Sequence, residues 1–365
     1  MTPTPRSRGA MDRRNETASR APGRGAWSAA VTLVAAVALV APLPPALVER
    51  YYSAGFFPVI QHTLTRTSNA VPFALFDVML AVVGGTLVIL CVRDLRAKRP
   101  WPRRLLRVGV RLTTTAALFY VAFLFAWGLN YRRVPLREKL LYSPDRISED
   151  AAEALARETV AELNRLHAPA HAEGWIGGPA VDAQLVRAFQ SAARATGNPV
   201  LVPARPKRSV LDLYFRRAGV SGMTDPFFLE TLVTSTLLPF ERPFVVAHEW
   251  SHLAGYSDEG EANFVGWLTC LHGGSGHQYS GWLFLYAEVM NSLPSRTARH
   301  IAAGLAGGPR EDLEAVRERL TREISRPLSN AGWQVYDQYL RANRVQGGTA
   351  SYADVVKLAI GTNVR

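Results

Sequence analysis

Three apolar stretches in the first third of the chain constrain its fold more than any other feature. They run from about Trp27 to Val48, from about Ala70 to Val92 and from about Val108 to Leu129. A helix of about 20 residues can cross the ~30 Å hydrocarbon layer of a bilayer. Buried helices of a soluble protein are the alternative, but Arg-rich flanks on alternate sides favour three membrane-spanning helices, with the lipid bilayer as a partner.

The first stretch is interrupted by prolines at positions 42, 44 and 45. Because proline lacks an amide hydrogen and clashes with the preceding turn, the helix should end or kink near Ala41. A basic tail before an apolar stretch is typical of an uncleaved signal anchor, and a cleavable signal peptide is the competing interpretation. The tail itself, residues 1–26, is rich in Arg, Pro and Ser and is predicted to be disordered.

Positive charge is concentrated in two segments beside the apolar stretches. The chain has a net charge of +12, of which residues 1–26 contribute +4 and residues 93–111 contribute +7. This local basicity is typical of membrane topology and argues against a nucleic-acid partner. Since Lys and Arg favour the cytoplasmic side, the tail and the 93–107 loop are predicted to be cytoplasmic and the 49–69 loop to lie outside. Residues from 130 onward would then be extracytoplasmic, in a multi-pass protein of the cell membrane.

After the third stretch the composition becomes mixed, which predicts a three-helix membrane region at 27–129 and a globular domain at 130–365. The β-branched segment 228–236 is predicted to be a strand, and 272–278 a Gly-rich loop. Apolar spacing and caps predict helices over 148–168, 181–195, 241–254, 259–271, 279–292, 310–325, 331–343 and 351–360. The expected fold class is mainly α (α+β), with a small sheet.

A single motif in the globular region carries chemistry. It is HExxH, formed by His248, Glu249 and His252 within VVAHEWSHLAG. Positions i and i+4 of a helix lie on one face about one turn apart, so the two imidazoles can share one zinc ion. Glu249 would lie beside the metal without binding it and could take a proton from water as the catalytic base. The alternative is an ordinary helix with two hydrogen-bonded histidines, but the uncharged residues around the motif suit a buried metal-bearing helix.

A catalytic zinc ion needs a third protein ligand and an open position, and three acidic residues follow Gly255, which should end the helix. Glu259 is the first choice, because it opens a second helix with Asn263 on the same face, where the amide could orient a ligand histidine. Glu261 is the next candidate, although it should point roughly away from Glu259. Asp258 is the third, because it completes HExxHxxGxxD as in metzincins, but it is also well placed to cap the second helix. Each could instead be a solvated carboxylate in a first helical turn.

The HExxH motif followed by ExxAN, from Glu259 to Asn263, resembles the gluzincin branch of zinc peptidases. In that branch the first Glu of the second element is the third zinc ligand. The resemblance therefore implies a zinc-binding set of His248, His252 and Glu259, with the Glu of HExxH as base and a zincin-like fold. The chain also resembles a bacterial membrane family, domain of unknown function 3810, through its N-terminal stretches, WGLNY at 127–131 and the HE..H..G...E.EAN pattern.

Two further roles are typical of zincins. An edge strand often pairs with an extended substrate, and 228–236 is the candidate here, with a plain core strand as the alternative. A Tyr or His often stabilises the oxyanion of the reaction. Candidates for that role are Tyr279, His277 and His272, each of which could instead be structural. Tyr336 and Tyr339 are interpreted as part of a core stripe at helical spacing.

The predicted function is a membrane-bound zinc metallopeptidase that hydrolyses amide bonds of a peptide or protein near the outer membrane face. One alternative is a non-catalytic zinc-binding scaffold or sensor in the membrane. Another is a hydrolase that acts on a non-peptide amide of the cell envelope. The presence of Glu249 favours catalysis, because a scaffold would not need it.

Overall fold

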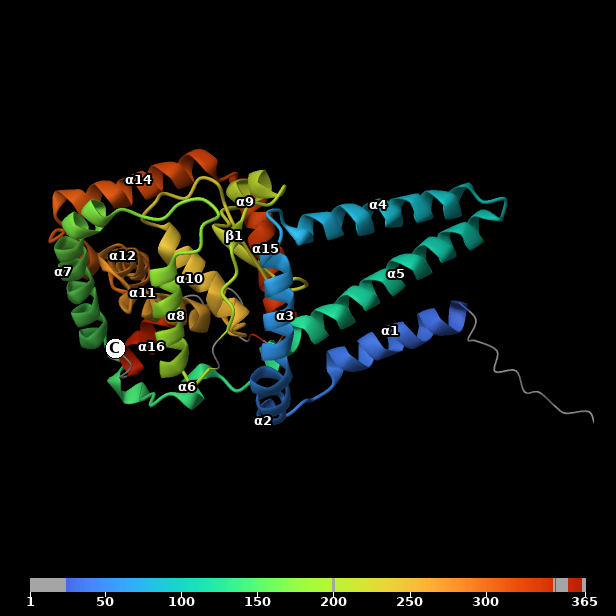
Figure 1. The fold of residues 1–365 in the computed structure, drawn as a ribbon, viewed down its shortest axis with the longest axis horizontal. Coiled ribbons are helices and arrows are strands. Elements are labelled where there is room, and N and C mark those ends of the chain that lie inside the picture. The colour runs from blue at the N-terminus through green and yellow to red at the C-terminus, as the bar shows by residue number, and fades with distance from the viewer. Residues whose placement is uncertain (1–23, 199–200, 344, 346–353, 363–365) are drawn as a thin grey trace, which may run out of the picture.

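The computed structural model describes residues 24–198, 201–343, 345 and 354–362. The tail predicted to be disordered, residues 1–26, lies outside these ranges except for its last three residues, which belong to helix α1 (Arg24–Val40). Figure 1 shows a body built mainly of helices, from one side of which α1, α4 (Leu75–Arg96) and α5 (Trp101–Ala126) project. The expected mainly helical class with a small sheet is confirmed for the described residues.

Two of the projecting helices, α4 and α5, are long and apolar enough to cross a membrane. Helix α1 has only 17 residues and ends at Val40, two residues before Pro42, which cannot continue it. Helix α1 and its continuation over Pro45–Asn69 meet at a bend of 112°, so together they form at most one broken span. Of the three predicted spans, the second and third are therefore supported as single helices. The expected break near Ala41 is present.

The segment expected to be an outer loop, residues 49–69, is helical and packs on the body. Gln61 Nε2 donates to the Val202 carbonyl at 2.6 Å, and Thr65 Oγ1 donates to the Leu229 carbonyl at 3.0 Å. The elements here are the short α2 (Pro45–Leu47), the π-helix η1 (Val48–Phe56) and α3 (Phe57–Asn69). The body therefore includes a segment from before the second apolar stretch, which the predicted domain boundary had separated from it.

A small sheet lies within the body. Its strands are β1 (Pro206–Lys207), β2 (Gly222–Asp225) and β3 (Glu230–Val233), in the order β1-β3-β2. The strand predicted at 228–236 is present as β3, but it is the central strand, with β1 parallel on one side and β2 antiparallel on the other. The interpretation of this segment as an edge strand is therefore wrong, because both of its sides are paired. The edge strand that contacts helix α10 (Arg242–Leu253) is β2.

A buried ion pair ties the sheet to the start of α4. Lys207 Nζ lies 2.6 Å from Glu230 Oε1, and both side chains are almost fully buried. Burying two charges is costly unless hydrogen bonds satisfy their remaining groups. Here Lys207 also donates to Ser68, and the Glu230 carboxylate accepts the backbone N–H groups of Leu75 and Phe76. This network fixes the first turn of α4 against the strand that precedes α10.

The predicted helices of the body are present with shifted ends, and short helices that were not predicted join them. The remaining elements are η2 (Gly128–Arg132), α6 (Leu136–Lys139), η3 (Pro144–Arg146), α7 (Glu149–Glu173), α8 (Ala183–Ala195), α9 (Asp212–Ala218), α11 (Glu259–Leu271), α12 (Ser275–Ser292), α13 (Ser295–Ala302), α14 (Gly307–Glu323), α15 (Arg326–Ala342) and α16 (Asp354–Gly361). The Gly-rich loop predicted at 272–278 is wrong beyond residue 274, because α12 begins at Ser275. Glycines of this region serve helix packing: a Cβ on Gly281 would come within 2.7 Å of the Cys270 Cβ.

Helices α10, α11 and α12 form the centre of the core. Trp250, Trp267 and Tyr279, one from each helix, are fully buried. Helix α11 is buried over almost its whole length, as expected for a helix that is apolar on most of its faces. The HExxH motif lies on α10 and the acidic residues that follow it begin α11, so the motif is in the interior of the body.

Candidate metal centre

The end of α10 is shaped by a glycine. Gly255 adopts φ 80°, its N–H donates to the His252 carbonyl at 2.9 Å, and the Tyr256 N–H donates to the Ser251 carbonyl at 3.1 Å. These two bonds form a Schellman motif, which favours glycine at the left-handed position. The helix end predicted at Gly255 is therefore confirmed, and the turn brings the chain back along the last turn of α10.

This turn orients the second histidine of the motif. His252 Nδ1 lies 2.7 Å from the Tyr256 carbonyl oxygen, and because a carbonyl can only accept, Nδ1 carries the hydrogen of that bond. The lone pair of the neutral imidazole is then on Nε2, the tautomer that a metal ligand needs. Trp127, at the end of α5, donates its indole N–H to the His252 carbonyl at 2.8 Å. The histidine is thus held by both the α10–α11 turn and the residue that follows α5.

Three ligand atoms converge at the junction of α10 and α11. His248 Nε2 and His252 Nε2 are 3.2 Å apart, and Glu259 Oε2 lies 3.4 Å from the first and 3.5 Å from the second. Ligands at about 2.0–2.1 Å from a tetrahedral zinc ion are separated by about 3.3 Å. The three side chains, which we call the HExxH group, therefore have the spacing of three ligands around one such ion.

The carboxylate oxygen of this group is buried without a hydrogen bond. Within the part of the chain that the structure describes, Glu259 Oε2 and His248 Nδ1 are buried atoms for which no hydrogen-bond partner is found. An unsatisfied buried carboxylate oxygen is costly, and a cation between the carboxylate and the imidazoles would satisfy it. Helices α10 and α11 can approach each other closely at this point because residue 266 is glycine. A Cβ on Gly266 would lie only 3.0 Å from the His248 backbone nitrogen. The donor set and its spacing fit a zinc ion.

The Glu259 carboxylate and the histidines of the HExxH group shift one another's pKa values. Burial by itself would raise the pKa of the Glu259 carboxyl, but His252 and His248 outweigh burial and lower it. Burial by itself would lower the pKa of His252, but Glu259 outweighs it and raises this pKa to about 9. In the absence of a cation, the carboxylate therefore holds a proton on the imidazole. A metal ion must displace that proton, so metal affinity should depend on pH.

Glu249 lies beside the ligands on α10 and faces the edge strand. Its side chain is 3% exposed, and its Oε2 lies 2.9 Å from Thr224 Oγ1 on β2. A Cβ on Gly222 would come within 2.6 Å of Glu249 Oε1, so β2 leaves room for the carboxyl only because this residue is glycine. Burial raises the pKa of Glu249, while the two histidines and Thr224 act in the opposite direction. A buried carboxyl with a raised pKa suits general acid–base chemistry.

The other two acidic candidates have structural partners. Asp258 is the N-cap of α11, and its Oδ1 accepts the Glu261 N–H at 3.1 Å, as its cap-like position predicts. Glu261 Oε1 accepts the Leu136 N–H at 2.5 Å. Among the described residues, neither carboxylate is part of the HExxH group. Asn263 is buried one turn after Glu259, and its predicted role in orienting a histidine stays a prediction.

The predicted oxyanion stabilisers have their contacts in other parts of the molecule. Tyr279 donates to Asp312, and His277 Nε2 lies 2.7 Å from Asp182 Oδ2. His272 donates through Nδ1 to a carbonyl one turn earlier on its own helix. None of these contacts joins the HExxH group, so the structure gives no support to this role for the three residues.

A tyrosine that was interpreted as core is a partner of the HExxH group instead. Tyr336, on α15, donates its hydroxyl to Glu259 Oε1, the oxygen that does not face the histidines. Its ring stacks on Tyr339, which packs against Tyr131, which in turn meets Trp127 edge to face. A signal was present in the sequence, because tyrosine in a core stripe needs a partner for its hydroxyl. The partner lies 77 residues away in the sequence.

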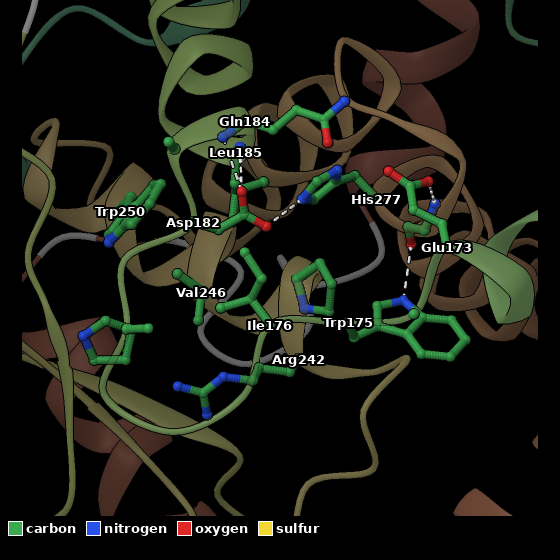
Figure 2. A pocket seen from close by; sticks show the side chains of 16 residues that line it. Glu173, Trp175, Ile176, Asp182, Gln184, Leu185, Arg242, Val246, Trp250 and His277 are labelled. Atoms are coloured by element: carbon green, nitrogen blue, oxygen red, sulfur yellow. Dashed lines mark hydrogen bonds and ion pairs between the residues drawn. The ribbon is translucent and has the colours of Figure 1, made fainter.

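A cavity near the motif opens on the other face of α10. It has a volume of about 410 Å³ and is lined by Val246 and Trp250 together with Trp175, Asp182 and His277 (Figure 2). Helical geometry places positions 246 and 250 opposite the two ligand histidines. None of the HExxH group lines this cavity, so it is separate from the candidate metal centre.

Together the two imidazoles, the buried carboxylate and the adjacent Glu249 define a candidate three-ligand metal centre with an acid–base group beside it. The chain belongs to the family described as "Protein of unknown function (DUF3810)", whose model matches residues 52–360. The match runs from η1 to α16 and so includes α4, α5, the sheet and the whole HExxH group. No curated protein and no solved structure matches the chain.

Proposed function

We propose that the protein is a membrane-anchored, zinc-dependent metallopeptidase. The observation that carries the proposal is the triangle of His248 Nε2, His252 Nε2 and Glu259 Oε2, with sides of 3.2, 3.4 and 3.5 Å. Its third corner is a buried carboxylate oxygen without a hydrogen bond among the described residues. Two histidines and one carboxylate, with a fourth position open, are a ligand set used by catalytic zinc sites. A purely structural zinc site would usually have four protein ligands.

The residues of the chain divide the chemistry between them. The HExxH group would hold the zinc ion, which supplies Lewis-acid chemistry when bound. Tyr336 and the Tyr256 carbonyl orient two of the ligands, since each bonds the ligand atom that faces away from the centre. Glu249, the buried carboxyl next to a ligand histidine on α10, would take a proton from the attacking water and return it to the leaving amine.

The edge strand β2 supports a peptide as the substrate. An extended peptide can add to a sheet edge through backbone hydrogen bonds. Strand β2 is at the edge, pairs with β3 from Gly222 to Asp225, and contacts the Glu249 carboxyl through Thr224. A peptide lying along this strand would pass the candidate base. The role that the sequence suggested for 228–236 therefore passes to 222–225 in this proposal.

The membrane helices support a substrate close to the bilayer. Trp127 ends α5 and bonds the His252 carbonyl directly, so the candidate centre lies next to the point where a membrane helix enters the body. With the basic segment 93–107, which forms the end of α4 and the start of α5, in the cytoplasm, the body is extracytoplasmic in this proposal. Protease accessibility of a C-terminal tag in spheroplasts tests that orientation, and protection of the tag would contradict it.

Peptide cleavage by the purified full chain in detergent tests the function. The substrate is a diverse peptide mixture, and mass spectrometry identifies new peptide ends. We expect zinc-dependent cleavage that a chelator abolishes and that His252→Ala lacks, whereas His300→Ala, which removes an exposed histidine on α13, retains it. No chelator-sensitive cleavage of any peptide by zinc-loaded protein would contradict the peptidase proposal. Release of a product from cell-envelope amides under the same conditions would support the non-peptide alternative.

A further inference from the structure

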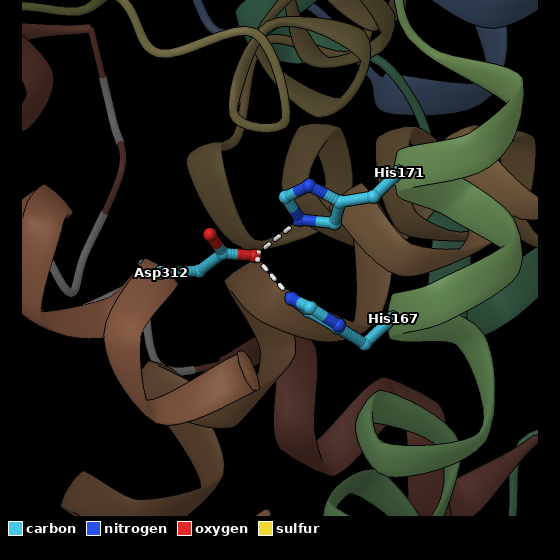
Figure 3. A group of neighbouring side chains, drawn as sticks. All are labelled: His167, His171 and Asp312. Carbon is cyan, nitrogen blue, oxygen red and sulfur yellow. Dashed lines mark hydrogen bonds and ion pairs between the residues drawn. The ribbon is translucent and has the colours of Figure 1, made fainter. Parts of the chain in front are cut away.

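A second group of potential ligands lies between α7 and α14, outside the proposed function. His167 and His171 are one turn apart on α7, and Asp312 faces them from α14 (Figure 3). Asp312 Oδ2 lies 2.8 Å from His171 Nε2 and 3.5 Å from His167 Nε2. The three ligand atoms all lie within 4.8 Å of one another. We call these residues the α7–α14 group.

The surroundings hold these side chains in place. Tyr279, fully buried on α12, donates its hydroxyl to Asp312 Oδ2 at 2.6 Å. Burial and the adjacent Asp312 raise the pKa of this phenol, so it stays a protonated donor. A hydrogen-bond donor on a ligating carboxylate is a common support of metal sites. On the other side, a Cβ on Gly308 would collide with the His167 imidazole, so glycine at the start of α14 makes room for that ring.

The ligand atoms of the group suit a divalent metal ion of intermediate softness, such as Zn²⁺. Two imidazole nitrogens and one carboxylate oxygen suit Zn²⁺, whereas Ca²⁺ and Mg²⁺ prefer all-oxygen sites. The side chain of His171 is 38% exposed, which leaves a path by which an ion can enter and water can complete its coordination. We propose that the α7–α14 group is a second metal site, which binds Zn²⁺ or a similar ion independently of the HExxH group.

The site would connect α7 to α14, and α14 also contacts the start of α10. Helix α14 also carries Arg319, whose guanidinium lies 2.7 Å from Glu241, the N-cap residue of α10. Glu323 at the end of α14 accepts a hydrogen bond from Thr236, just after β3. A metal ion that joins α7 to α14 would therefore stabilise the helix that contacts the start of the HExxH helix.

Equilibrium dialysis of the full chain in detergent against saturating Zn²⁺ tests the proposal. We expect two zinc ions per wild-type chain, one in His171→Ala, one in His248→Ala and none in the variant with both changes. His300→Ala, the exposed-histidine control, should bind two. Because each group is deleted separately, failure of the second site and failure of the HExxH site give different patterns.

Equal zinc content in wild type and His171→Ala would overturn the proposal, and the three side chains would then form a hydrogen-bonded histidine–aspartate cluster only. If His171→Ala does not fold, Asp312→Asn replaces it, because it keeps the side-chain size and removes the anionic ligand. A second readout uses Co²⁺ as the probe. Wild-type protein should show the absorption of two cobalt centres, and Asp312→Asn should lose one of them while retaining that of the HExxH group.

Discussion

The HExxH group and the α7–α14 group use one ligand pattern in two settings. Each has two histidines one turn apart on one helix and a carboxylate from another helix. The ligand side chains of the HExxH group are 3–13% exposed, and those of the α7–α14 group are 11–38% exposed. The first group is formed by helices adjacent in sequence, whereas the second joins helices that are more than 130 residues apart.

The two groups also differ in the titratable side chain that lies beside each of them. Beside the HExxH group is Glu249, a buried carboxyl that can exchange a proton. Beside the α7–α14 group is Tyr279, a phenol whose raised pKa keeps it protonated. In the two proposals, similar ligands serve hydrolysis in the HExxH group and the connection of helices in the α7–α14 group. The predictions below test this division.

The largest effect is expected on activity, from Glu249→Gln. Replacing the carboxylate by an amide removes the proton acceptor, so the rate of cleavage should fall by about 10²–10⁴-fold. Zinc content should stay at the wild-type value, because the metal ligands are unchanged. Tyr279→Phe should leave the rate of cleavage nearly unchanged. Rates and bound zinc are measured on the same samples, with Glu318→Gln on the exposed face of α14 as the matched control. If Glu249→Gln cleaves at the wild-type rate, Glu249 is not the catalytic base, and the proposed difference in role between the two groups would be contradicted.

Next in size is the stability given by the second metal. An ion present at about 100 times its Kd adds about 2.7 kcal/mol to the free energy of unfolding, which for a domain of about 200 residues raises Tm by roughly 5–10 °C. Asp312→Asn should lose this zinc-dependent increment. Thermal unfolding is followed with and without zinc, in a His248→Ala background that removes the first site. An undiminished increment in Asp312→Asn would show that the ion binds elsewhere.

A smaller effect is expected from Tyr336→Phe. The substitution removes the hydroxyl that bonds Glu259 Oε1 but keeps the ring stacked on Tyr339. Loss of a hydrogen bond that supports a ligand typically weakens metal affinity by about 10–100-fold. Competition with a chromogenic chelator measures this affinity. Tyr339→Phe is the control, and equal affinities in the two variants would contradict a specific role for Tyr336.

A further prediction concerns pH and separates the fold from both metal groups. Burial raises the pKa of Asp225 to about 7, although the Phe227 and Phe228 N–H groups oppose this. The folded state then binds more protons than the unfolded chain between about pH 4 and pH 7, so this carboxyl lowers stability as pH rises through that window. Each unit of pKa difference corresponds to about 1.4 kcal/mol.

Urea unfolding of chelator-treated protein at pH 5 and pH 8 measures this contribution. Wild type should lose more stability between the two pH values than Asp225→Asn does. Chelation is essential, because protonation of the ligand histidines would otherwise release metal in the same range. An identical pH dependence in the two proteins would show that Asp225 is ionised throughout.

Local sequence signals predicted the HExxH group but not the α7–α14 group. The HExxH spacing, Gly255 as the helix end and Asp258 as a cap are all local features that one or two turns of helix determine. The α7–α14 group has the same His-x-x-x-His spacing, but it lacks the internal Glu, and its carboxylate comes 141 residues later. Nothing in the sequence near His171 indicates Asp312.

Errors in the fold have the same origin. The segment 228–236 was correctly predicted as a strand, but whether a strand is central or at an edge depends on its partners, and β1 has only two residues. The prolines at 42, 44 and 45 predicted the break after α1, but hydropathy could not show that 57–69 packs on the body through Gln61 and Thr65. Buried polar side chains such as these resemble exposed ones until their acceptors are known.

Zinc content of the folded full chain, compared between Glu259→Gln and Glu261→Gln, tests the central claim most directly. Both substitutions remove one carboxylate from the first turn of α11, so effects on that turn are matched. The HExxH group requires that Glu259→Gln bind one zinc ion fewer than wild type and that Glu261→Gln bind as many as wild type. Loss of zinc in Glu261→Gln but not in Glu259→Gln, or no zinc in folded wild-type protein, would contradict it.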